Sequence, residues 1–285
     1  MTKPKPYYHK KRITTALLLA AGMGSRLSPL TQSAPKCLTM VNETCILDRL
    51  IASLNHHGLK RLVVVTGHLE DSIRNFLEDR AGNLVIEYVF SPRYKTTNNI
   101  YSLWMARNLI NEPFLLIESD LVFDSSLLKE MLYPDRIAVA SIKPWLNGST
   151  VTINQSRQVD AFHSDTSGTP PRTKYKTVNI YSFSLSSWYQ VVDVLNKYIR
   201  AGKVNDYYEV IFRDMVAQKS LSLKAISFDG KPWYEIDTIE DLASAERLFP
   251  SKISEKLPFY DIDQNADKHK ADSNWGLKGQ GHAIA

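Results

Sequence analysis

The stretch Ala16–Lys36, ALLLAAGMGSRLSPLTQSAPK, decides the fold that we expect for this chain. Its apolar beginning ends abruptly at Gly22 and Gly24, which is typical of a buried parallel strand that runs into a tight loop. Glycine allows positive φ angles and lets backbone N–H groups approach the oxygens of a phosphate. Arg26 and Lys36 add the positive charge that a polyphosphate requires. The stretch therefore predicts a strand followed by a phosphate-binding loop.

The pentapeptide GMGSR, residues 22–26, leaves other interpretations open when it is taken alone. It lacks the third glycine of a dinucleotide-binding fingerprint and the G-K-[ST] ending of a P-loop. An ordinary strand-to-helix turn with a solvated arginine is one alternative. A secretory signal is another, because three basic residues precede the apolar run. Thr14 and Thr15 interrupt that pattern, the run is short, and further strand patterns follow it, all of which disfavour a signal.

Strand and helix patterns alternate along the chain. Apolar, β-branched runs predict strands at residues 13–20, 62–66, 85–90 and 114–119, and apolar periodicity predicts helices at 42–57, 70–78 and 98–108. This order predicts an α/β fold with a doubly wound, mostly parallel, Rossmann-like sheet. The alternating residues 137–184 predict a small antiparallel subregion, with a loop or lid at 164–176. Helices at 185–201 and 205–216, a strand at 221–228 and a helix from Thr238 complete the expected order.

Two carboxylates follow expected strands. Asp120 comes directly after the apolar strand 114–119, and Asp237 ends the short stretch 233–237. Because the carboxyl ends of parallel strands meet at one edge of a sheet, we expect both side chains beside the glycine loop. Hard oxygen ligands next to a triphosphate suit Mg²⁺, so both are candidate metal ligands. For Asp120, capping of the following turn is the alternative.

The composition limits the class of protein. The chain has 285 residues, of which 44% are hydrophobic and 23% charged, and its net charge is +5. These values are ordinary for a globular protein, and the basic excess fits a solvated surface or an anionic small substrate better than nucleic acid. The two cysteines, Cys37 and Cys45, predict no disulfide framework, which favours a reducing cytoplasm. No apolar run reaches the roughly 18 residues that membrane insertion requires.

The longer string LLLAAGMGSRLSPLTQSAPKCL, residues 17–38, resembles the signature loop of nucleotidyltransferases that join a nucleoside triphosphate to a phosphorylated acceptor. The family pattern is L-A-A-G-x-G-x-R-L-x-P-L-T-x-x-x-P-K-x-L, and every fixed position is present from Leu19 to Leu38. The resemblance implies that the glycine loop wraps the triphosphate and base. It also implies that Arg26 contacts the β- and γ-phosphates and that Lys36 approaches the α-phosphate.

The resemblance extends from about residue 13 to residue 249 and is thin through the middle of the chain. It implies that Asp120 and Asp237 bind the metal, with Mg²⁺ as the cofactor. We therefore expect a flexible arm at residues 1–12, a nucleotidyltransferase domain at 13–250, and a flexible tail or linker at 251–285.

Three further segments indicate the acceptor. N-N-x-Y-S-L at residues 98–103, V-N-D-Y-Y at 204–208 and Y-E-I-D at 234–237 resemble bacterial phosphocholine cytidylyltransferases and relatives that activate 2-aminoethylphosphonate. The resemblance implies CTP as the donor. The acceptor's amine is left open: a quaternary ammonium requires a cage of aromatic rings, for which the candidates are Tyr181, Tyr207, Tyr208 and Trp145. A primary amine instead requires a carboxylate such as Asp206 or Glu209.

The expected function is therefore Mg²⁺-dependent transfer of a cytidylyl group from CTP to phosphocholine, phosphoethanolamine, 2-aminoethylphosphonate or a similar acceptor. A sugar- or inositol-phosphate nucleotidylyltransferase and a catalytically silent nucleotide-binding regulator are the alternatives. The sequence leaves open whether the chain forms a homodimer.

The expected site residues fall into three groups. The expected catalytic residues are Arg26, Lys36, Asp120 and Asp237. The nucleotide-binding residues are Leu19, Ala20, Ala21, Gly22, Met23, Gly24, Ser25, Arg26, Lys36, Gly67 and Ser119. The acceptor-binding residues are Asn98, Asn99, Ser102, Tyr181, Asp206, Tyr207, Tyr208 and Glu235.

Overall fold

The first strand, β1 (Thr15–Ala20), lies between two parallel neighbours in the main sheet. It pairs with β4 (Arg61–Thr66) on one side and with β6 (Phe114–Glu118) on the other. Every residue of β1 is buried, because side chains alternate between the two faces of a sheet that is covered on both sides. Leu17 packs into one hydrophobic core and Leu18 into the other.

The computed structural model describes residues 12–143, 146–163 and 173–250. They belong to a compact unit that ends at Pro250. Residues 1–11 of the expected arm, residues 164–172 of the expected lid, Trp145 and the tail 251–285 lie outside the described residues, so these expectations stay predictions. No helix in the described ranges combines the length and the hydrophobicity needed to cross a bilayer.

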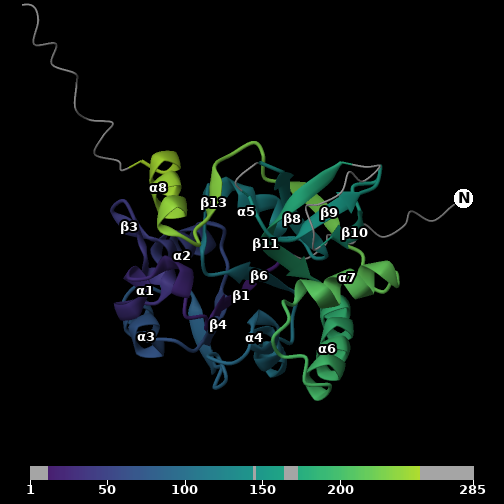
Figure 1. Ribbon diagram of the computed structural model, residues 1–285, viewed down its shortest axis with the longest axis horizontal. Coiled ribbons are helices and arrows are strands. Elements are labelled where there is room, and N and C mark those ends of the chain that lie inside the picture. The colour runs from purple at the N-terminus through teal and green to yellow at the C-terminus, as the bar shows by residue number, and fades with distance from the viewer. Residues whose placement is uncertain (1–11, 144–145, 164–172, 251–285) are drawn as a thin grey trace, which may run out of the picture. The chain divides into compact units, whose positions relative to one another are not determined.

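The main sheet is mixed (Figure 1). Its strands in spatial order are β10 (Val159–His163), β9 (Thr150–Ile153), β11 (Lys174–Phe183), β6, β1, β4 and β5 (Val85–Phe90). β8 (Arg136–Ser141) pairs with β11 and with β12 (Lys224–Ser227). The strands β6, β1, β4 and β5 are parallel, whereas β11 runs antiparallel to β6, β8 and β9. The prediction of a mostly parallel α/β sheet with a small antiparallel subregion is therefore confirmed.

Helices cover both faces of this sheet (Figure 1). One core contains residues of α2 (Ile46–His56), α3 (Glu70–Glu78) and α5 (Leu128–Met131). The other contains residues of α4 (Asn99–Met105), α6 (Leu185–Arg200) and α7 (Glu209–Ala217). This arrangement is the doubly wound one that the alternation of strands and helices predicts.

Short elements complete the fold beside this sheet. A third, smaller core joins α8 (Ile239–Leu248) to residues of the glycine-loop region and of two ribbons. The ribbons are β2 (Met40–Val41) with β3 (Thr44–Cys45), and β7 (Leu121–Phe123) with β13 (Trp233–Glu235). The one-turn helix α1 (Leu30–Ser33) follows the glycine loop.

Two helices begin later than the sequence predicts. The expected helix 42–57 begins at Ile46, because residues 40–45 form the β2–β3 hairpin with Asn42 at a positive φ of 55° in its turn. The expected helix 205–216 begins at Glu209, because the preceding residues form a loop that α4 holds in place. The side chain of Asn99 accepts a hydrogen bond from the backbone N–H of Tyr208 at 3.0 Å. Both shifts come from contacts between distant segments.

Candidate active site

The glycine loop follows β1 and begins a pocket. Gly24 has a φ of 62°, and a Cβ atom there would lie 3.0 Å from Thr31 and 3.2 Å from Lys36, so any other residue would be strained at this position. Gly22 differs from the expectation, because it does not adopt a positive φ. A Cβ atom at Gly22 would meet nothing within 4 Å. Because Gly22 has no side chain, it leaves the backbone at this position open to the pocket.

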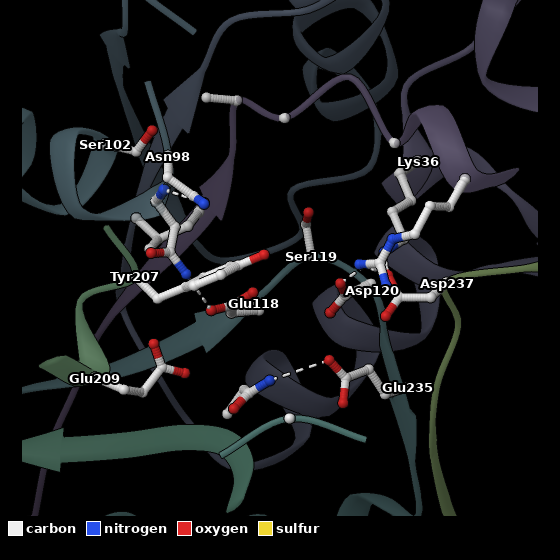
Figure 2. Close-up of a pocket in the computed structure, with 18 of the residues that line it drawn as sticks. Lys36, Asn98, Ser102, Glu118, Ser119, Asp120, Tyr207, Glu209, Glu235 and Asp237 are labelled. Atoms are coloured by element: carbon white, nitrogen blue, oxygen red, sulfur yellow. Dashed lines mark hydrogen bonds and ion pairs between the residues drawn. The ribbon is translucent and has the colours of Figure 1, made fainter. Parts of the chain in front are cut away.

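A pocket of about 430 Å³ lies at the carboxyl ends of β1 and β6, which is where ligands bind in open α/β sheets. Figure 2 shows Lys36, Asp120 and Asp237 at one end of this pocket and Tyr207 and Glu209 at the other. The glycine loop thus shares one cavity with both expected metal ligands.

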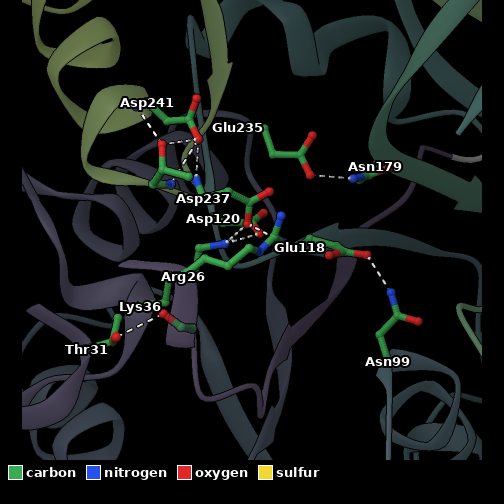
Figure 3. Close-up of polar contacts among 12 residues, drawn as sticks. Arg26, Thr31, Lys36, Asn99, Glu118, Asp120, Asn179, Glu235, Asp237 and Asp241 are labelled. Carbon is green, nitrogen blue, oxygen red and sulfur yellow. Dashed lines mark hydrogen bonds and ion pairs between the residues drawn. The ribbon is translucent and has the colours of Figure 1, made fainter. Parts of the chain in front are cut away.

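Lys36 joins the two aspartates. Its Nζ lies 2.8 Å from Asp120 Oδ2 and 2.7 Å from Asp237 Oδ1 (Figure 3). Arg26 also donates to Asp237 Oδ1, at 2.8 Å, although its own side chain is 68% exposed. Burial alone lowers the pKa of an ammonium, but the two carboxylates outweigh it and raise the pKa of Lys36 above its ordinary value. Lys36 is therefore fully charged at neutral pH.

Asp237 reaches the pocket by a route that the sequence did not predict. It follows β13, which pairs with β7 in a separate ribbon and not with the main sheet. The backbone N–H of Ile236 donates to the Asp120 carbonyl oxygen at 3.0 Å, which ties the two carboxylate-bearing segments together. The Asp241 carboxylate accepts hydrogen bonds from the N–H groups of Asp237 and Thr238, within the capping box of α8. The two aspartates therefore meet beside the glycine loop as expected, but Asp237 comes from the β7–β13 ribbon and not from a strand end of the main parallel sheet.

Between these two ends, the pocket carries carboxylates that are paired with amides. Asn99 donates to Glu118 Oε1 at 3.0 Å, and Asn179 donates to Glu235 Oε1 at 3.1 Å (Figure 3). The Lys176 Nζ lies 3.2 Å from Glu235 Oε2, and its side chain is only 2% exposed. Burial raises the pKa of the Glu118 carboxyl, and the charges of its acidic neighbours raise it further.

Glu209, the first residue of α7, has a buried carboxyl group with an exposed fraction of 8%. Burial raises the pKa of this carboxyl from 4.5 to about 7. The nearby Lys176 charge acts to lower this pKa, and the Glu235 charge acts to raise it. Glu209 is therefore ionised above pH 7 at a cost to the folded state.

Replacing Glu209 with Gln is expected to stabilise the fold at pH 8 and to leave its stability nearly unchanged at pH 4. Because the pKa is higher in the folded state, the folded protein binds the Glu209 proton more tightly. The stability that this proton gives is lost as the pH rises from 4.5 through about 7. Gln has no such proton, so E209Q is expected to exceed the parent by roughly 1–3 kcal/mol at pH 8 in urea unfolding.

Glu118, Glu235 and Lys176 face Glu209, and loss of the Glu209 charge also lowers the pKa of Glu118, which acts in the same direction at pH 8. The matched control is E78Q, which changes an exposed glutamate on α3 and is expected to shift stability by less than about 0.5 kcal/mol at either pH. An E209Q protein that is no more stable than the parent at pH 8 would contradict the raised pKa.

Most of the predicted site residues line this pocket. They are Leu19, Ala21, Gly22, Gly24, Ser25, Arg26, Lys36, Asn98, Asn99, Ser102, Ser119, Asp120, Tyr207, Glu235 and Asp237. Their roles in binding and catalysis stay predictions, since what the structure gives is their position.

The structure puts six predicted residues elsewhere. Ala20, Met23, Gly67, Tyr181, Asp206 and Tyr208 do not line the pocket. Tyr181 and Tyr208 are fully buried, and their rings pack against each other and against Phe212 in the core. Gly67 allows its backbone to lie close to Ala21 and Tyr94, because a Cβ atom there would lie 2.7 Å from the Ala21 carbonyl oxygen and 2.8 Å from Tyr94.

Several lining residues were not among the expected site residues. They are Tyr94, Thr97, Glu118, Asn147, Gly148, Ser149, Lys176, Asn179 and, named only as a possible amine ligand, Glu209. Glu118 has a sequence signal, since it is a carboxylate two residues before Asp120 at the end of an apolar strand. Lys176 has one too, as a lysine within the β-branched stretch of β11.

Comparisons with known proteins agree with this geometry. Residues 15–142 match the family model described as nucleotidyl transferase. The chain is 29% identical over 260 residues to a CMP-5'-(3-aminopropyl)phosphonate synthase of Streptomyces rubellomurinus, covering 85% of this chain and 40% of that protein. It is 23% identical over 243 residues to a choline-phosphate cytidylyltransferase of Streptococcus pneumoniae, covering 83% of this chain and 99% of that one.

A solved structure of CTP:phosphocholine cytidylyltransferase from Streptococcus pneumoniae has the same fold. Its TM-score is 0.73 with 21% identity, and the match covers 84% of this chain and 100% of that one. Together with the glycine loop and the paired aspartates, these matches show that the chain is similar to nucleotidyltransferases, with phosphocholine and phosphonate enzymes among the similar proteins.

Proposed function

We propose that this protein transfers a cytidylyl group from CTP to a small phosphorylated amino alcohol or aminophosphonate and releases pyrophosphate. One observation carries the proposal: a single pocket joins the glycine loop and the Lys36–Asp120–Asp237 cluster to a wall of carboxylates and amides. The first end suits a triphosphate and the second suits an amine. The names of the relatives support CTP and this class of acceptor.

Asp120 and Asp237 fit a bound Mg²⁺. Asp120 Oδ1 is buried and has no hydrogen-bond partner among the described residues, so it is free to ligate a cation. The described ranges contain no set of three or more His, Cys, Asp or Glu residues arranged to hold a metal. Mg²⁺ needs no such set, because one or two carboxylates, water and substrate phosphates complete its shell. When bound, it would supply positive charge against the phosphate oxygens.

The side chains of the pocket account for the rest of the reaction. An oxygen of the acceptor's phosphate or phosphonate forms a bond to the α-phosphorus of CTP. The bond from that phosphorus to the bridging oxygen breaks, and pyrophosphate leaves with the electron pair. The Lys36 ammonium, fixed by the two aspartates, would stabilise the charge that develops on the α-phosphate, and Arg26 would bind the leaving phosphates. No covalent intermediate with the protein is required.

The direct test is pyrophosphate release from each of the four nucleoside triphosphates, with Mg²⁺ and a panel of acceptors. We expect release with CTP and an aminophosphate or aminophosphonate, and a CMP-linked product by mass spectrometry. Release only with sugar 1-phosphates or inositol phosphate would favour the sugar or inositol alternative. CTP binding by calorimetry without release for any acceptor would favour a silent regulator. Cys37 and Cys45 are buried free thiols, which suits the reducing cytoplasm that we propose as the location.

A further inference from the structure

Glu209 carries a carboxylate oxygen that lacks a donor. Its Oε2 is buried and has no hydrogen-bond partner within the described part of the chain. Glu209 lines the pocket, and Figure 2 shows its carboxylate directed into the cavity, below the ring of Tyr207. A buried carboxylate oxygen without a donor is costly, so such a group indicates that a ligand completes it.

Acidic groups outnumber basic ones around Glu209. Glu118 and Glu235 already receive hydrogen bonds from Asn99 and Asn179, and Lys176 is paired with Glu235. Among the described residues of this wall, three glutamates therefore face one lysine. A cation placed beside Glu209 would favour the ionised form of these buried carboxyls, whose pKa values burial raises, and would supply the missing donor. An uncharged or anionic group, such as a sugar hydroxyl or a carboxylate, would not do both.

The shape of the wall distinguishes between two kinds of cation. A quaternary ammonium binds through the faces of several aromatic rings and has no N–H to donate. Among the described lining residues, only Tyr94 and Tyr207 are aromatic, and Tyr207 is 57% exposed. Of the other candidate rings, Tyr181 and Tyr208 are enclosed in the core, and Trp145 lies outside the described residues. A primary ammonium has three N–H donors and can complete the Glu209 oxygen.

We infer that Glu209 binds the amino end of the acceptor and selects a primary ammonium over a quaternary one. This inference rests on the proposed function and narrows its acceptor class to ω-amino phosphates and phosphonates. Glu209 is thus an acceptor-binding residue at the end of the pocket opposite the reacting phosphorus. The amides of Asn99 and Asn179 hold the two neighbouring carboxylates, which leaves Glu209 to the ligand.

The test is a methylation series in the pyrophosphate assay with CTP and Mg²⁺. The acceptors are phosphoethanolamine, its N-methyl and N,N-dimethyl forms, phosphocholine, 2-aminoethylphosphonate and 3-aminopropylphosphonate. For the parent protein, we expect kcat/KM for phosphocholine to be at least about 100-fold below that for the best primary amine, because the site's buried oxygen is then left unpaired. The methylated forms are expected to lie between these limits.

The E209Q variant makes the test specific to this residue. Gln keeps the shape but loses the charge, so we expect KM for the primary amines to rise roughly 10- to 100-fold. The KM for CTP should change less than about twofold, and the preference over phosphocholine should fall to within a few fold. The control E78Q, on an exposed face of α3, is expected to match the parent in every measurement. Thermal unfolding establishes that both variants are folded.

The outcomes separate the inference from the function on which it rests. Turnover of phosphocholine as fast as phosphoethanolamine by the parent would overturn the inference and leave the proposed function standing. An unchanged preference in E209Q would do the same. Absence of release with every amine acceptor, alongside release with a sugar 1-phosphate, would overturn the proposed function and the inference with it.

Discussion

Replacing Asp120 with Asn is expected to lower kcat for pyrophosphate release roughly 10³-fold, because a fixed negative charge is removed where the proposed metal and Lys36 both bind. The fold should survive the change. The contact that ties residue 120 to the β13 segment uses its backbone carbonyl oxygen, which the substitution does not change. We expect the Mg²⁺ concentration for half-maximal rate to rise and the KM for CTP to change less than the rate.

The control for this variant is D124N. Asp124 lies four residues further along and caps the following turn through its side chain, and Asn caps equally well. It does not line the pocket, so D124N should retain the parent rate. A D120N protein within tenfold of the parent rate, at saturating Mg²⁺, would contradict a metal-binding role for Asp120.

The sequence predicted the part of the site that depends on local patterns. Gly24 and Asp120 follow closely on apolar runs, and Lys36 lies within the loop signature that begins at the first of these runs, so local sequence was enough to place all three. Asp237 was predicted correctly as a pocket residue and wrongly as a strand end of the main sheet. Its true route depends on the pairing of β13 with β7, and hydrophobic periodicity carries no information about which distant segments pair.

The pocket residues that come from β11 were harder to predict, because this strand is irregular. The register of β11 against β8 shifts between Thr177 and Tyr181, and Asn179 has a φ of 57° there. In a regular strand, Lys176 and Asn179 would lie on opposite faces, since neighbouring residues alternate. The irregularity brings both into the pocket and turns Tyr181 into the core. No strict alternation pattern could place these three residues correctly.

The position of Glu209 in the pocket was missed for a different reason. An acidic residue in the first turn of a helix is common, because it interacts favourably with the helix dipole. The predicted helix began four residues too early, which placed Glu209 in its interior. Only the packing of α4 against this segment shows that the carboxylate faces a cavity.

Replacing Lys36 with Met is expected to abolish measurable transfer and also to make the fold dependent on Mg²⁺. The Lys36 ammonium bridges two carboxylates whose side chains are only 12% and 20% exposed, and Met leaves those charges facing each other. Removing one partner of a buried ion pair costs about 3–5 kcal/mol, and the partial exposure here reduces our expectation to roughly 2–4 kcal/mol. Arg26 compensates little, because its side chain is largely exposed.

Calorimetric Tm values with and without Mg²⁺ measure this effect. If Asp120 and Asp237 hold the cation, Mg²⁺ should raise the Tm of K36M more than that of the parent, in which the ammonium competes for the same oxygens. K231M, which breaks an exposed pair with Asp124 at 3.6 Å, should lower stability by less than about 0.5 kcal/mol and show no Mg²⁺ response. A K36M protein as stable as K231M would mean that the bridge seen in the pocket contributes nothing, whereas a destabilised K36M that ignores Mg²⁺ would assign the two aspartates to Lys36 alone.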